Sequence, residues 1–207
     1  MGTAGNSFPL YPALRMKDLL RKELFTCSSV LDIGCGSNSP IQNMDVHYTL
    51  GVDSFKPYVE KSKIKGIHTE YMIADINKIE FKERSFDAVI ALDFIEHLDK
   101  ETGYQLIKKM QKWAIKKVIL LTPNGHVWQD DYDNNESQKH QSGWSAEELR
   151  ALGFRVCGMA GWKPLRGYRN TVKLRPALFG IAVSGLSQSI TYYVPSLAFQ
   201  LFAVRNS

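Results

Sequence analysis

Val30-Leu31-Asp32-Ile33-Gly34-Cys35-Gly36-Ser37-Asn38 joins an apolar run to two closely spaced glycines. Its apolar start predicts a buried strand, and the two glycines predict a tight turn directly after that strand. Gly34 and Gly36 have no Cβ, so the backbone there can approach a ligand closely. Asp53 follows about twenty residues later, at the end of the next apolar run, where a carboxylate can accept both hydroxyls of a ribose. This combination is typical of domains that bind an adenosine-containing cofactor.

Outward from this stretch, apolar runs alternate with segments of helical periodicity. We expect strands at 29–33, 47–52, 68–74, 86–92, 117–121, 154–159 and 197–204, and helices at 15–25, 56–65, 100–114 and 145–152. Ser145 and Glu148 stand at the positions of a capping box, and Gly153 is placed to end that helix. The strands are continuous apolar runs, as burial on both faces requires. The pattern predicts an α/β fold: a doubly wound, mostly parallel seven-stranded sheet with helices on both faces.

Several motifs resemble those of class I S-adenosylmethionine-dependent methyltransferases. Asp32-Ile33-Gly34-Cys35-Gly36 is similar to the first motif of that family, although Asn38 stands where the family often has a third glycine. Gly51-Val52-Asp53, Ala74-Asp75-Ile76 and the segment from Ser85 to Leu98 match later motifs in order. The resemblance covers roughly residues 28–160 and implies S-adenosylmethionine as the cofactor. An NAD-dependent dehydrogenase is disfavoured because Ser39 occupies the last glycine position of the dinucleotide fingerprint.

The resemblance also implies which residues bind the cofactor. The glycine turn would face its amino-acid part, Asp53 its ribose, Asp75 and Ile76 its adenine, and the turn after 86–92 its methyl group. The full predicted set is Asp32, Gly34, Cys35, Gly36, Asp53, Ser54, Asp75, Ile76, Leu92 and Asp93. Asp32, Asp75 and Asp93 could instead simply cap turns at the ends of strands.

Methyl transfer from a sulfonium is an in-line displacement, so a base is needed only when the acceptor atom starts protonated. We predict His140 and His97 as catalytic residues, with Asp93 and His126 as further candidates, because histidine titrates near neutrality. The alternative interpretation of each histidine, as a structural residue of a surface loop or a cap, stays open. In the family an Asn/Asp-Pro-Pro-aromatic tetrad marks methylation of amino groups, and none follows residue 92 here. We therefore expect transfer to oxygen.

Charge is distributed unevenly along the 207 residues. The formal net charge is +5, yet residues 149–207 hold eight Lys and Arg and no acid, which leaves residues 1–148 slightly acidic. We expect one methyltransferase domain over 1–207, with an N-terminal helical segment at about 12–26 and a basic and apolar insertion at about 162–195. Apolar residues beside cations describe an interfacial segment, so the insertion predicts a small-molecule or lipid-linked acceptor and contact with an anionic membrane surface. Within it we expect a helix at 177–187 rather than a transmembrane span.

Two alternatives remain open. The basic tail could hold the phosphates of RNA, which would make the chain an RNA methyltransferase, although no recognised RNA-binding module is present and nucleic acid is the less favoured partner. The chain could also be a non-catalytic cofactor-binding subunit. Three cysteines without a CxxC pair or Cys/His spacing give no sign of a metal site. We expect a cytoplasmic protein, with a peripheral membrane association as a variant of that location.

Overall fold

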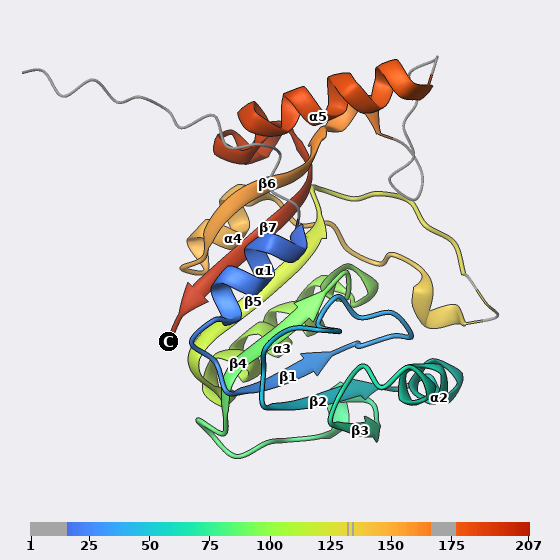
Figure 1. Cartoon of the computed structure of the whole chain (residues 1–207), viewed down its shortest axis with the longest axis vertical. Coiled ribbons are helices and arrows are strands. Elements are labelled where there is room, and N and C mark those ends of the chain that lie inside the picture. The colour runs from blue at the N-terminus through green and yellow to red at the C-terminus, as the bar shows by residue number, and fades with distance from the viewer. Residues whose placement is uncertain (1–15, 132, 134, 167–176) are drawn as a thin grey trace, which may run out of the picture.

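The computed structural model describes residues 16–131, 133, 135–166 and 177–207. Seven strands form one sheet (Figure 1): β1 (Ser29–Ile33), β2 (Tyr48–Asp53), β3 (Glu70–Ile73), β4 (Phe86–Leu92), β5 (Ala114–Pro123), β6 (Arg155–Trp162) and β7 (Ala198–Asn206). Their order across the sheet is β3-β2-β1-β4-β5-β7-β6. The pairs among β1 to β5 are parallel, and β7 runs antiparallel to both β5 and β6. The predicted doubly wound, mostly parallel sheet is confirmed.

The strands follow the apolar runs of the sequence. β1 and β4 have the predicted bounds, and the partly exposed residues of these two strands are Ser29, Asp87 and Leu92. β5 begins at Ala114, three residues earlier than expected, because Ala114 pairs with Phe86 across a register shift. The lysines that follow look like a helix terminus in sequence. In the structure Lys116 binds Asp87 at 3.1 Å, so the early part of β5 is a strand with a charged, partly exposed side.

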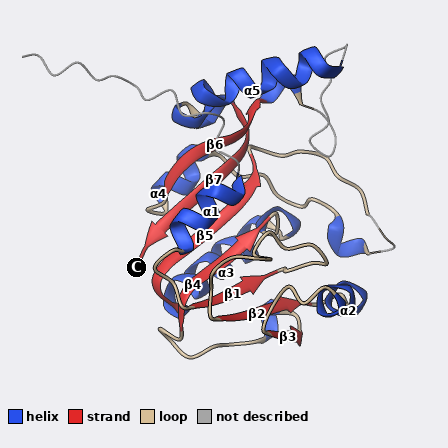
Figure 2. Ribbon diagram, in the orientation of Figure 1, coloured by secondary structure: helices blue, strands red, loops and turns tan. Residues whose placement is uncertain are grey.

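Helices cover both faces of the sheet (Figures 1 and 2). α3 (Lys100–Trp113) and α4 (Ala146–Ala151) pack on one face, and α1 (Met16–Leu24) packs on the other. α2 (Lys56–Ile64) lies against β2 and β3, and α5 (Ala177–Tyr193) lies against β6. The predicted capping box at the start of α4 is confirmed. Residues 12–15 of the expected N-terminal segment lie outside the described residues.

The loop after β5 is the segment that brings distant parts of the chain together. The described residues of 124–144 are mostly irregular, with one short 3₁₀ turn, η3 (Glu136–Gln138). Figure 2 shows this loop as a long trace from the end of β5 toward α2. The Tyr58 hydroxyl on α2 donates to Asp133 Oδ2 at 3.2 Å. The loop therefore lies across the edge at which the parallel strands end, where a doubly wound sheet binds its ligands.

α5 is longer than the helix expected at 177–187, since it continues to Tyr193. Across the part of the chain that the structure describes, no helix combines the length and the apolar character needed to span a membrane.

Candidate functional site

The glycine turn after β1 is fastened to the end of β2. The backbone N–H groups of Gly34 and Cys35 both donate to the Val52 carbonyl, and the N–H of Gly36 donates to Asp53 Oδ2 at 3.0 Å. Gly34 has a φ of 66° and Gly36 a φ of 55°, in the left-handed region that favours glycine. The turn that the sequence predicted is therefore formed by the two glycines that the sequence singled out.

Asp32 is buried and holds the base of the turn. Its Oδ2 accepts from Ser39 Oγ at 2.5 Å and contacts His68 Nε2 at 2.9 Å. The His68 ring fits because Gly51 has no side chain: a Cβ there would lie 2.8 Å from His68 Nδ1. The turn-stabilising interpretation of Asp32 thus has a structural basis, and its contact with a cofactor stays a prediction. Sequence reasoning missed His68, since nothing in its neighbourhood marks a partner 36 residues away.

Two adjoining pockets lie over this edge of the sheet, with volumes of about 470 and 270 Å³. Both are lined by Gly34, Asp53, Phe94 and His97. Every residue of the predicted cofactor set lines at least one of them: Asp32, Gly34, Cys35, Gly36, Asp53, Ser54, Leu92 and Asp93 the larger, and Asp75 and Ile76 the smaller. The structure therefore brings together residues that are spread over more than sixty positions of sequence.

The acids at the strand ends differ in their surroundings. Asp53 Oδ1 accepts from the Phe55 N–H at 2.8 Å. Burial raises the pKa of Asp53, against the opposing effect of its hydrogen bonds from Phe55 and Gly36. Asp75 is more exposed and accepts from the Asn77 N–H at 3.0 Å, which makes it the N-cap of the short turn η1 (Ile76–Lys78). The alternative interpretation of Asp75 as a cap is thus confirmed. Asp75 also lines the smaller pocket, so its contact with a cofactor stays a prediction.

The turn after β4 borders both pockets. Phe94 lies directly over the glycine turn, so closely that a Cβ on Gly34 would be 2.0 Å from the ring. Asp93 has a φ of 51°, and its Oδ1 accepts from Gln200 Nε2 at 3.0 Å. Its side chain opens into the larger pocket. The protein around this opening shields the carboxylate from bulk water, which raises the pKa of Asp93 to about 6.

Both predicted catalytic histidines meet at this turn. The rings of His97 and His140 are 4.8 Å apart between centroids and nearly perpendicular. Burial, and then the neighbouring His140, lower the pKa of His97 to about 4, and burial also lowers the pKa of His140. Both rings are therefore neutral at pH 7, and His97 is too weak a base to match neutral pH well. Their roles in catalysis stay a prediction.

Glu96 is a residue of this cluster that sequence reasoning missed. It is 2% exposed, and burial followed by the negative charge of Asp93 raises its pKa well above the usual value. The loop after β5 also contributes residues that were not predicted. Asn135, Ser137 and Gln138 line the larger pocket, and Gln141 lines the smaller one. A polar loop without periodicity offers no signal that would have selected these positions.

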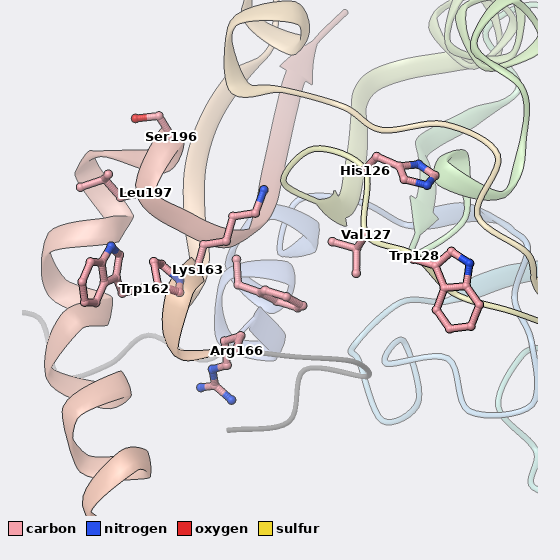
Figure 3. A pocket seen from close by; sticks show the side chains of 10 residues that line it. His126, Val127, Trp128, Trp162, Lys163, Arg166, Ser196 and Leu197 are labelled. Carbon is pink, nitrogen blue, oxygen red and sulfur yellow. The ribbon is translucent and has the colours of Figure 1, made fainter. Parts of the chain in front are cut away.

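A third cavity, an open groove of about 720 Å³, lies beside the pockets at the ends of β5 and β6. Figure 3 shows Trp128 and His126 on one side of it and Trp162, Lys163 and Leu197 on the other. Both indoles are exposed, at 68% for Trp128 and 44% for Trp162. Phe199 also lines this groove and precedes Gln200, the partner of Asp93. His126 thus lies in the groove, apart from the pair formed by His97 and His140.

Comparisons with known proteins agree with this arrangement. A family described as a methyltransferase domain matches residues 31–122. A probable tRNA methyltransferase 9B of Mus musculus is 32% identical over 163 residues, 64% of this chain and 34% of that protein. A small RNA 2'-O-methyltransferase of Tetrahymena thermophila is 23% identical over 168 residues, 66% of this chain and 39% of that protein. The chain therefore spans little more than a third of the length of either relative.

The fold is shared with solved structures. A SAM-dependent methyltransferase from Archaeoglobus fulgidus superposes with a TM-score of 0.56 at 16% identity, covering 92% of this chain and 94% of that one. The matched methyltransferase domain runs from within β1 to within β5, and it contains β2, β3, β4, the glycine turn and the Asp93 turn. Residues 31–122 therefore match a methyltransferase domain, and the chain has the fold of S-adenosylmethionine-dependent methyltransferases.

Proposed function

We propose that this enzyme transfers the methyl group of S-adenosylmethionine to a hydroxyl oxygen of an RNA nucleotide. The observation that carries the proposal is the groove beside the cofactor pockets, which combines two exposed indoles with cations. Bases of single-stranded RNA stack on aromatic side chains, and cations hold the adjoining phosphates. Lys163 and Arg166 supply positive charge on the same side of the groove as Trp162 (Figure 3).

The position of the groove supports this use. Val127 lines the groove, and its carbonyl lies 2.6 Å from Nδ1 of His140, whose ring is 4.8 Å from the ring of His97 on the turn after β4. A nucleotide in the groove would thus lie next to the turn that the family places beside the methyl group. The names of the two RNA methyltransferase relatives point in the same direction.

Oxygen is preferred as the methylated atom for two reasons. The segment Asp93-Phe94-Ile95-Glu96 stands where amino-group methyltransferases of this class carry their proline-containing tetrad. In addition, His97 and His140 present neutral imidazoles beside the pocket, and such rings can accept a hydrogen bond from a hydroxyl. A lysine or arginine side chain at this place would offer no such acceptor.

A small-molecule or lipid-linked acceptor is the second candidate. It is favoured by exposed apolar residues at the rim of the groove and along the end of α5, namely Leu186, Ile190, Tyr193, Val194 and Leu197. An acyl chain would bury such residues, and the cations beside them would suit an anionic head group. The two candidates differ in which chemical fraction of a cell becomes methylated.

Radiolabelled S-adenosylmethionine tests the proposal directly. The chain is incubated with tRNA, with small RNA and, separately, with metabolite and lipid extracts. We expect label in RNA, and Trp128→Ala or Trp162→Ala should lower the transfer rate about 5- to 150-fold, from the loss of about 1–3 kcal/mol of stacking per base. Phe25→Ala is the matched control, because that ring is 84% exposed and lines none of these cavities.

The products distinguish the alternatives. Digestion of labelled RNA to nucleosides should place the methyl group on oxygen, and label on a base nitrogen would contradict the choice of atom. Label confined to the lipid or metabolite extract would replace RNA by the second candidate.

A further inference from the structure

Three side chains with metal-binding atoms converge beside the cofactor pockets. They are Glu96 and His97, on the short turn η2 (Ile95–His97), and His140, on the loop after β5. One carboxylate oxygen of Glu96 and one nitrogen of each ring all lie within 4.8 Å of one another. The three residues come from segments more than forty positions apart, which is why the sequence showed no metal-binding spacing.

The histidines are held in the tautomer that leaves Nε2 available to a metal ion. His140 Nδ1 lies 2.6 Å from the Val127 carbonyl, and His97 Nδ1 lies 3.3 Å from the Lys139 carbonyl. A carbonyl oxygen can only accept, so Nδ1 carries the hydrogen in both rings and Nε2 keeps its lone pair. Metal-binding histidines are oriented in this way, with the second ring nitrogen donating to a backbone carbonyl or a carboxylate.

Glu96 provides an independent observation. Its Oε2 is buried and has no hydrogen-bond partner in the described structure, and the residue is 2% exposed. An unpartnered buried polar atom is costly, and a buried carboxylate is normally paired with a cation or bound to a metal. No lysine or arginine among the described residues forms an ion pair with it. The residue whose carboxylate oxygen lacks a partner belongs to the same cluster as the two oriented imidazoles.

The surrounding backbone fixes these side chains in place. The N–H groups of Gln141 and Ser142 donate to the Glu96 carbonyl at 2.8 and 3.1 Å, and Gln141 Nε2 donates to the His97 carbonyl at 2.7 Å. Trp144 Nε1 adds a bond to the Ile95 carbonyl at 3.4 Å. The loop that carries His140 is thus bound along η2, so the cluster is organised before any ligand arrives.

We propose that Glu96, His97 and His140 bind one divalent first-row transition-metal ion. Two imidazoles and one carboxylate suit such an ion better than Mg²⁺ or Ca²⁺, which prefer oxygen ligands. Bonds of about 2.0–2.2 Å keep any two ligands of one ion within about 4.3 Å, so the cluster closes slightly when the ion binds. Three protein ligands leave coordination positions free.

The location of the cluster indicates what those free positions can do. His97 lines both cofactor pockets, so the ion faces the space where donor and acceptor meet. An acceptor hydroxyl bound there would be positioned for attack and would lose its proton more readily. This role depends on the proposed function, whereas binding of the ion does not.

Metal titration of the full chain, without an affinity tag and stripped by a chelator, tests the proposal. Calorimetry with Mn²⁺, Zn²⁺ or Co²⁺ should show one ion per chain. Glu96→Gln and His140→Asn should each weaken binding by at least about tenfold. Glu60→Gln and His47→Asn are matched controls, because both residues are exposed and lie outside these pockets. Cobalt should also give visible absorption bands that His140→Asn changes.

The outcomes separate the metal site from the methylation reaction. The proposal is overturned if the stripped chain binds no ion stoichiometrically, or if Glu96→Gln binds as the control Glu60→Gln does. If Glu96→Gln does not fold, metal titration of His140→Asn and the cobalt absorption bands still test the site. Stoichiometric binding without methylation of any RNA would support the site while refuting the proposed acceptor. Undiminished RNA methylation in chelator, or by Glu96→Gln, would refute the catalytic role of the ion.

Discussion

The contact between the glycine turn and Phe94 can be tested with Gly34→Ala. An added Cβ would lie 2.0, 2.5 and 2.7 Å from three atoms of the Phe94 ring, and the residue would have to keep a φ of 66°. The left-handed conformation costs an alanine about 1–2 kcal/mol. Displacing the ring costs up to about 1.5–3 kcal/mol more in lost burial. We therefore expect Gly34→Ala to lower the free energy of unfolding by about 2–5 kcal/mol.

Gly36→Ala is the matched control for the backbone term. Gly36 has a φ of 55°, but a Cβ there would meet no atom within 4 Å. Only the conformational cost of about 1–2 kcal/mol applies to this variant. For a chain of this length, 1 kcal/mol shifts Tm by about 2–4 °C, so thermal unfolding separates the two variants.

The double variant Gly34→Ala/Phe94→Ala isolates the clash. Without the ring, Gly34→Ala should destabilise the protein only through the left-handed backbone conformation that the alanine must adopt. Its effect on the free energy of unfolding should then fall to about that of Gly36→Ala. Equal costs of Gly34→Ala in the presence and absence of the Phe94 ring would refute the claim that this ring closes over the turn.

Three further predictions concern single interactions. His68→Ala removes one of the two partners of the buried Asp32 carboxylate and should lower the free energy of unfolding by about 1–3 kcal/mol in urea titrations. An unchanged midpoint would contradict the pairing. Ser145→Ala removes the capping box of α4 and should lower the free energy of unfolding by about 1 kcal/mol. Ser189→Ala on α5 is the control. The pKa of His97 falls from 6.5 to about 4 on folding. Between pH 6.5 and pH 4 the imidazole is therefore protonated in the unfolded chain and neutral in the folded chain. In chelator, the stability advantage of the wild type over His97→Asn should thus be full above pH 6.5 and shrink by up to about 3 kcal/mol toward pH 4. A pH-independent difference would refute the burial of this ring.

The sequence predicted what depends on local pattern. β1 and β4 were placed correctly because each is a continuous apolar run closed by a glycine turn or an acid. The capping box of α4 was recognised for the same reason, since both of its members lie within one helical turn. The order of the motifs along the chain was enough to select ten candidate cofactor residues, and all ten line the two pockets at one edge of the sheet.

What the sequence could not show depends on contacts between distant segments. His68 is important only because Gly51 leaves room for it and Asp32 faces it. Glu96 resembles an ordinary helix-start acid until the loop after β5 folds back and buries it beside His140. The early start of β5 was likewise hidden, because Lys116 and Lys117 find their acidic partners on β4 and α1.

We expect the edge of the sheet at Asp53 to bind the cofactor through its ribose. Calorimetry with S-adenosylhomocysteine on the wild type, Asp53→Asn and the exposed control Asp45→Asn measures this directly. Loss of charge-assisted hydrogen bonds worth about 1.5–3 kcal/mol should weaken binding about 10- to 150-fold in Asp53→Asn alone. NAD should not bind any of the three proteins. An Asp53→Asn protein that is folded and binds S-adenosylhomocysteine as tightly as the wild type would refute this role of Asp53.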